Sequence, residues 1–114
     1  MRVLWTLCLV GCAAVAPSSD TGLALCDEPP VLTWENFGHG LVVERCQSCH
    51  SSSSVRRNGA PETVTFDTHD ETLEHAHRIL QRVVVDQTMP PQGGIDVEDL
   101  QRIQIWLQCW EGVE

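Results

Sequence analysis

The feature that most constrains this chain is a short motif of two cysteines and a histidine, Cys46-Gln47-Ser48-Cys49-His50. Two thiols at this spacing near the end of a helix can reach the two vinyl groups of one haem, and the adjacent histidine then faces the iron from the same side. The motif is therefore typical of covalent c-type haem attachment, with His50 as an axial iron ligand. One motif predicts one haem.

Two other interpretations of the motif are a thioredoxin-like redox pair and part of a zinc site. A redox pair of that kind is expected within a βαβ pattern, and there is little strand signal around Cys46 and Cys49. A zinc site would need a matching Cys or His pair further along the chain, and the sequence has none at suitable spacing. Haem attachment is therefore the favoured interpretation.

Helical periodicity predicts an all-α domain built from three to four helices. Thr33, Thr68 and Asp96 are placed to cap three of them, with Thr68 at the start of a Thr-His-Asp-Glu capping box. The first helix should run into Cys46 and the middle one should end near Asp86. The predicted buried faces are Trp34, Phe37 and Leu41; Leu73, Ala76, Leu80 and Val84; and Leu100, Ile103, Leu107 and Trp110, with Trp106 beside them.

The segment 88–94, Thr-Met-Pro-Pro-Gln-Gly-Gly, is predicted to form an irregular turn, because its paired prolines and glycines exclude a helix. Met89 in this turn is the only methionine after Met1, which makes it the main candidate for a sixth iron ligand. A thioether stabilises ferrous iron and raises the reduction potential relative to a second histidine. The alternatives are that Met89 fills the core or that His77 binds the iron instead. The remaining histidines, His39, His69 and His75, are predicted to be solvated on helix surfaces, and a core or surface role is favoured over iron binding for His77 as well.

The order of these elements resembles the class I cytochrome c family over residues 26–109. A helix enters CxxCH, and a loop, a middle helix, a Met-Pro turn and an aromatic-rich last helix follow. The Thr-Met-Pro-Pro turn and the closing Trp-Leu-x-Cys helix are similar to those of periplasmic single-haem domains. The resemblance implies the cytochrome c fold, with the helices wrapped around one covalently bound haem and Met89 as the distal ligand. It also implies that the first and last helices cross near Gly38 or Gly40 and Trp106 or Trp110.

Two residues of the loop after the motif are candidates to support the haem. In the family, a proline carbonyl accepts a hydrogen bond from the ligand histidine, and Pro61 occupies the comparable place. Arg56 and Arg57 are candidates to neutralise the haem carboxylates, because a guanidinium binds a carboxylate through two hydrogen bonds. Arg57 is preferred because it lies closer to Pro61 in the sequence, and solvated loop charges are the alternative.

Cys26 and Cys109 lie near the two ends of the predicted domain. An oxidising compartment and an even number of cysteines favour a disulfide between them. Because the first and last helices are expected to cross, the two cysteines should lie close together. Two free buried thiols are the alternative.

The N-terminus has the composition of an export signal: one arginine, an apolar run over 3–10, and then Leu-Val-Gly-Cys. This pattern resembles the lipobox of bacterial lipoproteins. It predicts a signal peptide over 1–11, a lipid anchor on Cys12, a flexible tether over 12–25 and the folded domain over 26–114. The alternative is an ordinary secretory signal cut near residues 14–16, which would discard Cys12. Either signal would export the protein to the periplasmic side of a bacterial membrane.

The chain has 7 basic residues, all arginine, and 16 acidic ones, for a net charge of −9. Such a charge argues against nucleic acid as a partner, because phosphates would be repelled. Shuttle cytochromes that dock through lysines are no guide to docking here, because this chain has no lysine. An acidic face that binds a basic patch on a partner is the more natural hypothesis.

These features together predict a periplasmic one-electron carrier with one haem c, ligated by His50 and Met89. It would exchange electrons with redox partner proteins and bind the membrane through its lipid anchor. No acid–base pair or nucleophile indicates an enzyme. Two alternatives stay open: a haem that reacts with gas or peroxide because Met89 is labile, and a relay subunit of a larger respiratory complex.

Overall fold

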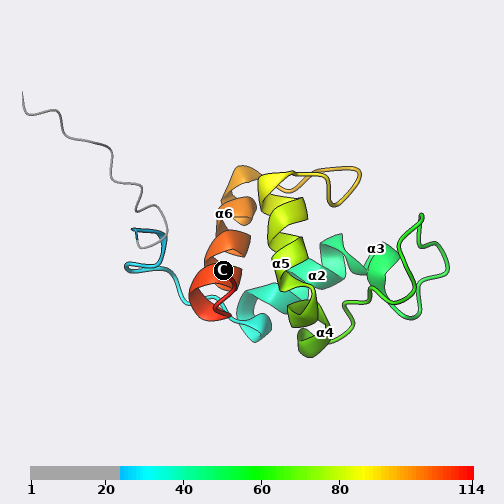
Figure 1. Ribbon diagram of the computed structural model, residues 1–114, viewed down its shortest axis with the longest axis horizontal. Coiled ribbons are helices and arrows are strands. Elements are labelled where there is room, and N and C mark those ends of the chain that lie inside the picture. Colours follow the sequence, from blue (N-terminus) through cyan, green and yellow to red (C-terminus); the bar gives the residue numbers. More distant parts are fainter. Residues whose placement is uncertain (1–23) are drawn as a thin grey trace, which may run out of the picture.

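The computed structural model describes residues 24–114, which form helices joined by loops, without a β-strand (Figure 1). The all-α prediction is therefore confirmed for this part of the chain. The predicted signal peptide (1–11), the lipidation site Cys12 and nearly all of the tether (12–25) lie outside the described residues. The helical segments are η1 (Trp34–Gly38), α2 (His39–Arg45), α3 (Gln47–His50), α4 (His69–Glu74), α5 (Ala76–Ile79), η2 (Leu80–Val85), α6 (Val97–Ile105) and η3 (Trp106–Trp110).

No helix between residues 24 and 114 combines the length and the apolar character needed to cross a membrane.

The three predicted N-caps are confirmed. The Thr33 side chain accepts a hydrogen bond from the backbone of Asn36, whose own side chain accepts one from the Thr33 backbone. Thr68 begins the predicted capping box, and Asp96 caps α6. These caps satisfy backbone N–H groups that the first turn of a helix leaves without an intrahelical partner. Each helix therefore begins where its sequence predicts.

Two of the three predicted helices, the first and the middle one, are each interrupted once. The first is π-helical in η1, continues through α2, and bends at Cys46 before the short helix α3. The middle one bends at His75, where the backbone leaves helical geometry (φ −108°, ψ 6°) between α4 and α5. The two bends matter for the site, because both flank residues that face the same cavity.

The core lies where the last helical segment packs against the middle one. Figure 1 shows α6 next to α5, with α3 at the end of the molecule away from the C-terminus. Trp110 was predicted to lie on the buried face, but its side chain is 44% exposed. Val84, also predicted to be buried, packs at the edge of the core cluster. The buried cluster consists of Ala76, Leu80, Val83, Ile103, Trp106 and Leu107.

The first and last helical segments touch at Gly38 and Trp106. A Cβ atom built on Gly38 would lie 2.5 Å from the Trp106 ring, which is completely buried. No atom lies within 4 Å of the same position on Gly40. Of the two glycines that the resemblance offered for the crossing, Gly38 is therefore the one that permits close approach.

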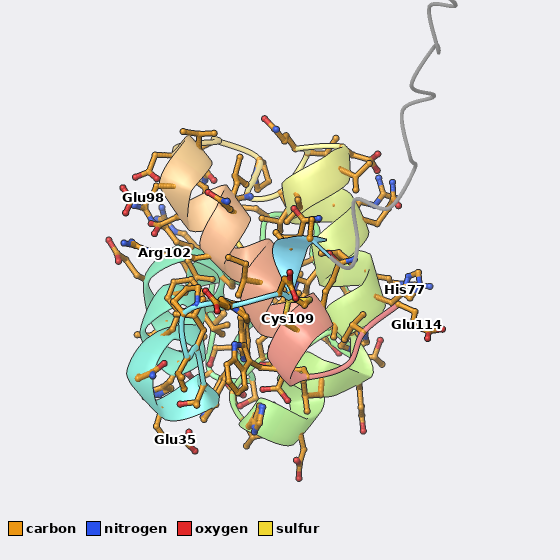
Figure 2. The ribbon with its side chains drawn as sticks, turned by 90° about the vertical axis from the view of Figure 1, so that its left-hand side faces the viewer. Glu35, His77, Glu98, Arg102, Cys109 and Glu114 are labelled. Atoms are coloured by element: carbon orange, nitrogen blue, oxygen red, sulfur yellow. A yellow bond between two sulfur atoms is a disulfide. The ribbon has the colours of Figure 1, made fainter. Side chains whose placement is uncertain are left out.

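Cys26 and Cys109 lie at disulfide distance, with Sγ atoms 1.97 Å apart and Cα atoms 5.4 Å apart (Figure 2). The two residues are 83 positions apart in the sequence. On the chain-entropy model, a cross-link that closes so long a loop stabilises by up to about 4–5 kcal/mol. Beside it, Trp110 Nε1 donates a hydrogen bond to the Pro30 carbonyl over 2.9 Å. This corner joins the N-terminal segment to the end of the last helix.

Candidate functional site

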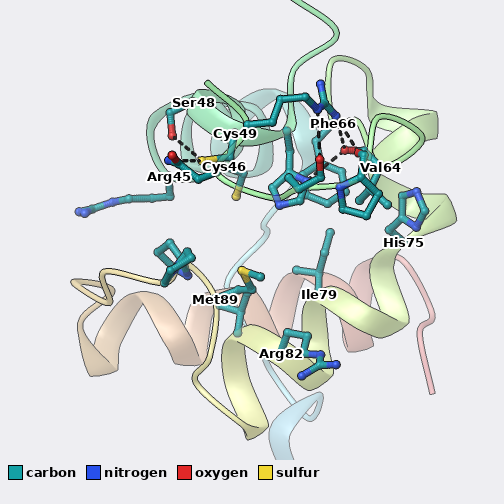
Figure 3. A pocket seen from close by; sticks show the side chains of 18 of the residues that line it. Arg45, Cys46, Ser48, Cys49, Val64, Phe66, His75, Ile79, Arg82 and Met89 are labelled. Carbon is teal, nitrogen blue, oxygen red and sulfur yellow. Dashed lines mark hydrogen bonds between the residues drawn. The ribbon is translucent and has the colours of Figure 1, made fainter. Parts of the chain in front are cut away.

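A cavity of about 430 Å³ is lined by Cys46, Cys49, His50 and Met89 together. Figure 3 shows Cys46 and Cys49 on one side of it, with Met89 and Ile79 facing them from the opposite wall. The volume lies in the range of small-molecule and cofactor sites, roughly 300–1,000 Å³. Apolar and proline side chains form much of the lining: Val64, Phe66, Ile79, Val83, Pro90 and Pro91.

The bend at Cys46 sets the two cysteines of the motif on the cavity wall. Cys49 lies three residues later, on the same face of the short helix α3. Its Sγ atom accepts a hydrogen bond from Asn58 Nδ2 over 3.4 Å. Burial raises the pKa of the Cys46 thiol to about 11, so this thiol is neutral at neutral pH. Nucleophilic redox cysteines have lowered pKa values, and Cys46 has the opposite property.

The His50 ring is held from two sides. Its Nδ1 atom lies 3.0 Å from the Val64 carbonyl oxygen, and its ring centroid is 4.7 Å from that of Phe66. With a proton on Nδ1, this contact is a hydrogen bond and leaves Nε2 free to bind a metal. Phe66 is itself joined to the motif, because its backbone N–H donates to the His50 carbonyl over 2.7 Å.

The prediction that the Pro61 carbonyl accepts the His50 hydrogen bond is wrong. Residues 61–64 form a turn in which the Val64 N–H donates to the Pro61 carbonyl over 3.0 Å. The chain that follows brings the carbonyl of Val64 to the histidine instead. Pro61 still lines the cavity, so its predicted contact with a haem stays a prediction.

Arg57 holds the loop that carries this acceptor. Its guanidinium donates to the carbonyls of Ser51 (2.6 Å), Pro61 (2.8 Å), Ala60 (3.3 Å) and Val64 (3.4 Å). A guanidinium has five N–H donors, so four are already used on the backbone. Arg57 lines the cavity, and its predicted role in binding a haem carboxylate stays a prediction.

The histidine that lines the cavity is not the one considered as an alternative to Met89. His77, the expected rival ligand, is exposed and does not line the cavity, and Figure 2 shows it at the edge of the molecule. His75, predicted to be solvated, is half-buried and lines the cavity. Its ring meets Phe66 edge-on at a centroid distance of 5.8 Å. His75 shares a helix face with Ile79 and Arg82, which also line the cavity, whereas His77 lies on another face.

His69 is also half-buried, contrary to the prediction that it is solvated. It stacks on Trp34 at a centroid distance of 5.1 Å. Its Nε2 atom lies 2.9 Å from a Glu111 carboxylate oxygen that also accepts a hydrogen bond from Trp106 Nε1 over 2.9 Å. This group joins the start of α4 to the end of the last helix. His39 is exposed, as predicted.

Four arginines line the cavity, and no aspartate or glutamate does. This is a local excess of positive charge in a chain whose net charge is −9. Three of these arginines were not predicted from the sequence, because their relation to the cavity depends on how separate segments pack. A signal was nevertheless present for two of them, which follow His75 at helical spacing beside Ile79. The arginines are Arg45, Arg57, Arg78 and Arg82.

Among residues 24–114, no three His, Cys, Asp or Glu side chains are grouped so that they could hold a metal ion. A haem iron has a smaller requirement, because the porphyrin supplies four nitrogens and the protein adds at most two axial ligands. His50, His75 and Met89 are the side chains of the cavity that could serve as axial ligands.

A scan against protein-family models finds no match to this chain, and searches of curated proteins and of solved structures find none either.

Proposed function

We propose that this protein is an exported one-electron carrier of the class I cytochrome c type. One haem would be bound covalently through Cys46 and Cys49, with His50 and Met89 as axial ligands. The observation that supports the proposal is the convergence of these four side chains on one largely apolar cavity. The thioether lies on the wall opposite the two thiols (Figure 3).

The residues of the cavity suit a haem by their chemistry. Two thiols are available for thioether bonds, and the imidazole has its Nδ1 atom at a carbonyl, which leaves Nε2 for iron. A methionine sulfur completes an axial pair of the kind found in electron-transfer haems. The buried, neutral Cys46 thiol argues against a dithiol redox pair as the function of the same residues.

The haem would supply an iron that changes between the ferric and ferrous states, and the protein's part is to hold it and tune it. The Val64 carbonyl and the Phe66 ring fix the orientation of the His50 imidazole. Apolar walls exclude water, and nearby arginines favour the state with less positive charge. Both effects stabilise the reduced form and raise the reduction potential.

The membrane part of the proposal rests on the sequence alone. A lipid on Cys12 would keep the folded domain at the periplasmic surface of the membrane, on a tether of about a dozen residues. Partition of the mature protein into detergent, lost in Cys12→Ala, is the expected behaviour of a lipoprotein.

The deciding test is the optical spectrum and the mass of the protein, expressed with haem-attachment machinery. We expect a mass gain of one haem and a c-type spectrum. The ferric form should show the weak far-red band of iron bound to methionine sulfur. Met89→Ala should lose that band, whereas the control His77→Ala should keep it.

Other outcomes separate the alternatives. A c-type spectrum without the far-red band, altered in His75→Ala, would replace Met89 by His75 as the ligand. Carbon monoxide binding to the ferrous wild type at neutral pH would favour a gas-reactive haem. Absence of covalent haem from the wild type would refute the proposal.

A further inference from the structure

One face of the middle helical segment presents basic side chains to the cavity. His75, Arg78 and Arg82 are spaced at i, i+3 and i+7, and all three line the cavity together with Ile79. Neither arginine makes an ion pair with any residue between 24 and 114. Unpaired guanidinium groups beside an apolar cavity are suited to carboxylates of a bound ligand.

The two ends of the cavity differ chemically. Figure 3 shows Arg45, Cys46 and Cys49 toward one end and His75 toward the other. A haem carries its two vinyl groups on one pair of adjacent pyrroles and its two propionates on the other pair. If the vinyl groups bond to the cysteines, the carboxylates would point away from them, toward the middle helical segment that carries His75, Ile79 and Arg82.

The other cavity arginines are poorly placed for this task. Arg57 already donates to four backbone carbonyls, which leaves one N–H free. Arg45 directly precedes Cys46, so it lies at the end where the vinyl groups would bond. The side chains left for the carboxylates are those of the middle helical segment.

We propose that Arg78 and Arg82, on the cavity-lining face of the middle helical segment, bind the two haem carboxylates. This inference rests on the proposed function. It assigns the carboxylates to arginines of the middle helical segment, whereas the sequence predicted Arg57 of the loop. A guanidinium next to a carboxylate favours its ionised form. Loss of either arginine should therefore raise the pH at which the carboxylate ionises and change how the reduction potential depends on pH.

The experiment measures the reduction potential of the holoprotein as a function of pH in Arg78→Gln, Arg82→Gln and the double variant. Arg102→Gln is the matched control, because it removes one positive charge from an exposed site outside the cavity. We expect a more negative potential in each single variant and a larger change in the double variant. The ionisation step in the pH profile should move to higher pH in both, and the control should keep the wild-type profile.

The outcomes distinguish a failure of this inference from a failure of the proposed carrier function. Wild-type profiles in Arg78→Gln and Arg82→Gln, with haem attached, would overturn the inference and leave the proposed carrier intact. If the pH profile of the potential changed only in Arg57→Gln, the loop residue Arg57 would be the partner of the carboxylates instead. If the double variant accumulates no holoprotein, Arg78→Lys and Arg82→Lys, which keep the charge, should restore attachment and a potential near that of the wild type. Wild-type protein without haem would refute the function itself.

Discussion

Gly38→Ala is the change that most directly tests how the first and last helical segments pack. The new Cβ atom would lie 2.5, 2.7 and 2.9 Å from three carbon atoms of the Trp106 ring. Real Cβ atoms essentially never make such contacts, so either the ring or the helix must move. The ring has little freedom, because it is completely buried and its Nε1 atom donates to Glu111. Phe37 also packs edge-on against it, at a centroid distance of 6.1 Å.

The expected change in the free energy of unfolding for Gly38→Ala is the sum of two opposing effects. Overpacking of a well-packed core costs about 1–3 kcal/mol, and a pinned aromatic ring places Gly38→Ala near the upper end. Replacing a helical glycine by alanine returns up to about 1 kcal/mol through helix propensity. The net expectation is a loss of about 2 kcal/mol of unfolding free energy. For a domain of this size, that corresponds to a fall of roughly 8–16 °C in Tm.

Gly40→Ala supplies the matched control, two residues along the same helical segment. Nothing lies within 4 Å of its new Cβ atom, so only the propensity term remains. We expect Gly40→Ala to stabilise the protein by about 0.5–1 kcal/mol. The assay is urea unfolding of both variants and the wild type, followed by tryptophan fluorescence and helical circular dichroism. If the two variants change stability in the same direction, the close approach of Gly38 to Trp106 is refuted.

Two further predictions concern polar contacts that hold the loops. Glu111→Ala should destabilise the protein by about 1–3 kcal/mol, because the buried Trp106 N–H loses its acceptor. Glu111→Gln keeps an acceptor and should lose less stability in urea unfolding. Equal losses of stability in the two variants would contradict the role of this hydrogen bond. Hydrogen bonds from Ser51 and Ser52 hold the pKa of the Asp67 carboxyl below its ordinary value of 3.8. This contribution to stability is present above pH 3.8 and is lost as the pH falls through the lowered pKa. Asp67→Asn should therefore be less stable than the wild type at neutral pH, and the difference in unfolding free energy should shrink in acid. A difference that stays constant in acid would count against the hydrogen bonds from Ser51 and Ser52.

Local features of the fold were predictable, because a few neighbouring residues determine them. Thr33, Thr68 and Asp96 cap their helices through contacts within three or four positions. The motif cysteines and His50 could be located by spacing alone. The crossing of the first and last segments was predictable only to a pair of glycines. The choice of Gly38 depends on where the Trp106 ring lies, and no local pattern contains that information.

Errors arose where the fold determines which of two nearby groups reaches the site. His77 shares a face with apolar residues of the middle helical segment, but the face that lines the cavity carries His75 and Ile79 instead. Pro61 is near the expected place for the acceptor of the His50 hydrogen bond. The turn that follows it uses the Pro61 carbonyl and presents the carbonyl of Val64. In both cases the kind of group was right, a histidine ring and a backbone carbonyl, and the exact position depended on how the chain folds.

The charge of the site differs most from what the sequence indicates. A net charge of −9 describes the field that a distant partner meets, and it favours approach by a basic surface. Screening limits each charge to about 8 Å at physiological salt, so groups that line the cavity act mainly on what lies inside it or at its mouth. There the protein presents arginines and no carboxylates. The long-range field of the protein and the electrostatics of its cavity are therefore set by different residues, and total charge predicts only the first.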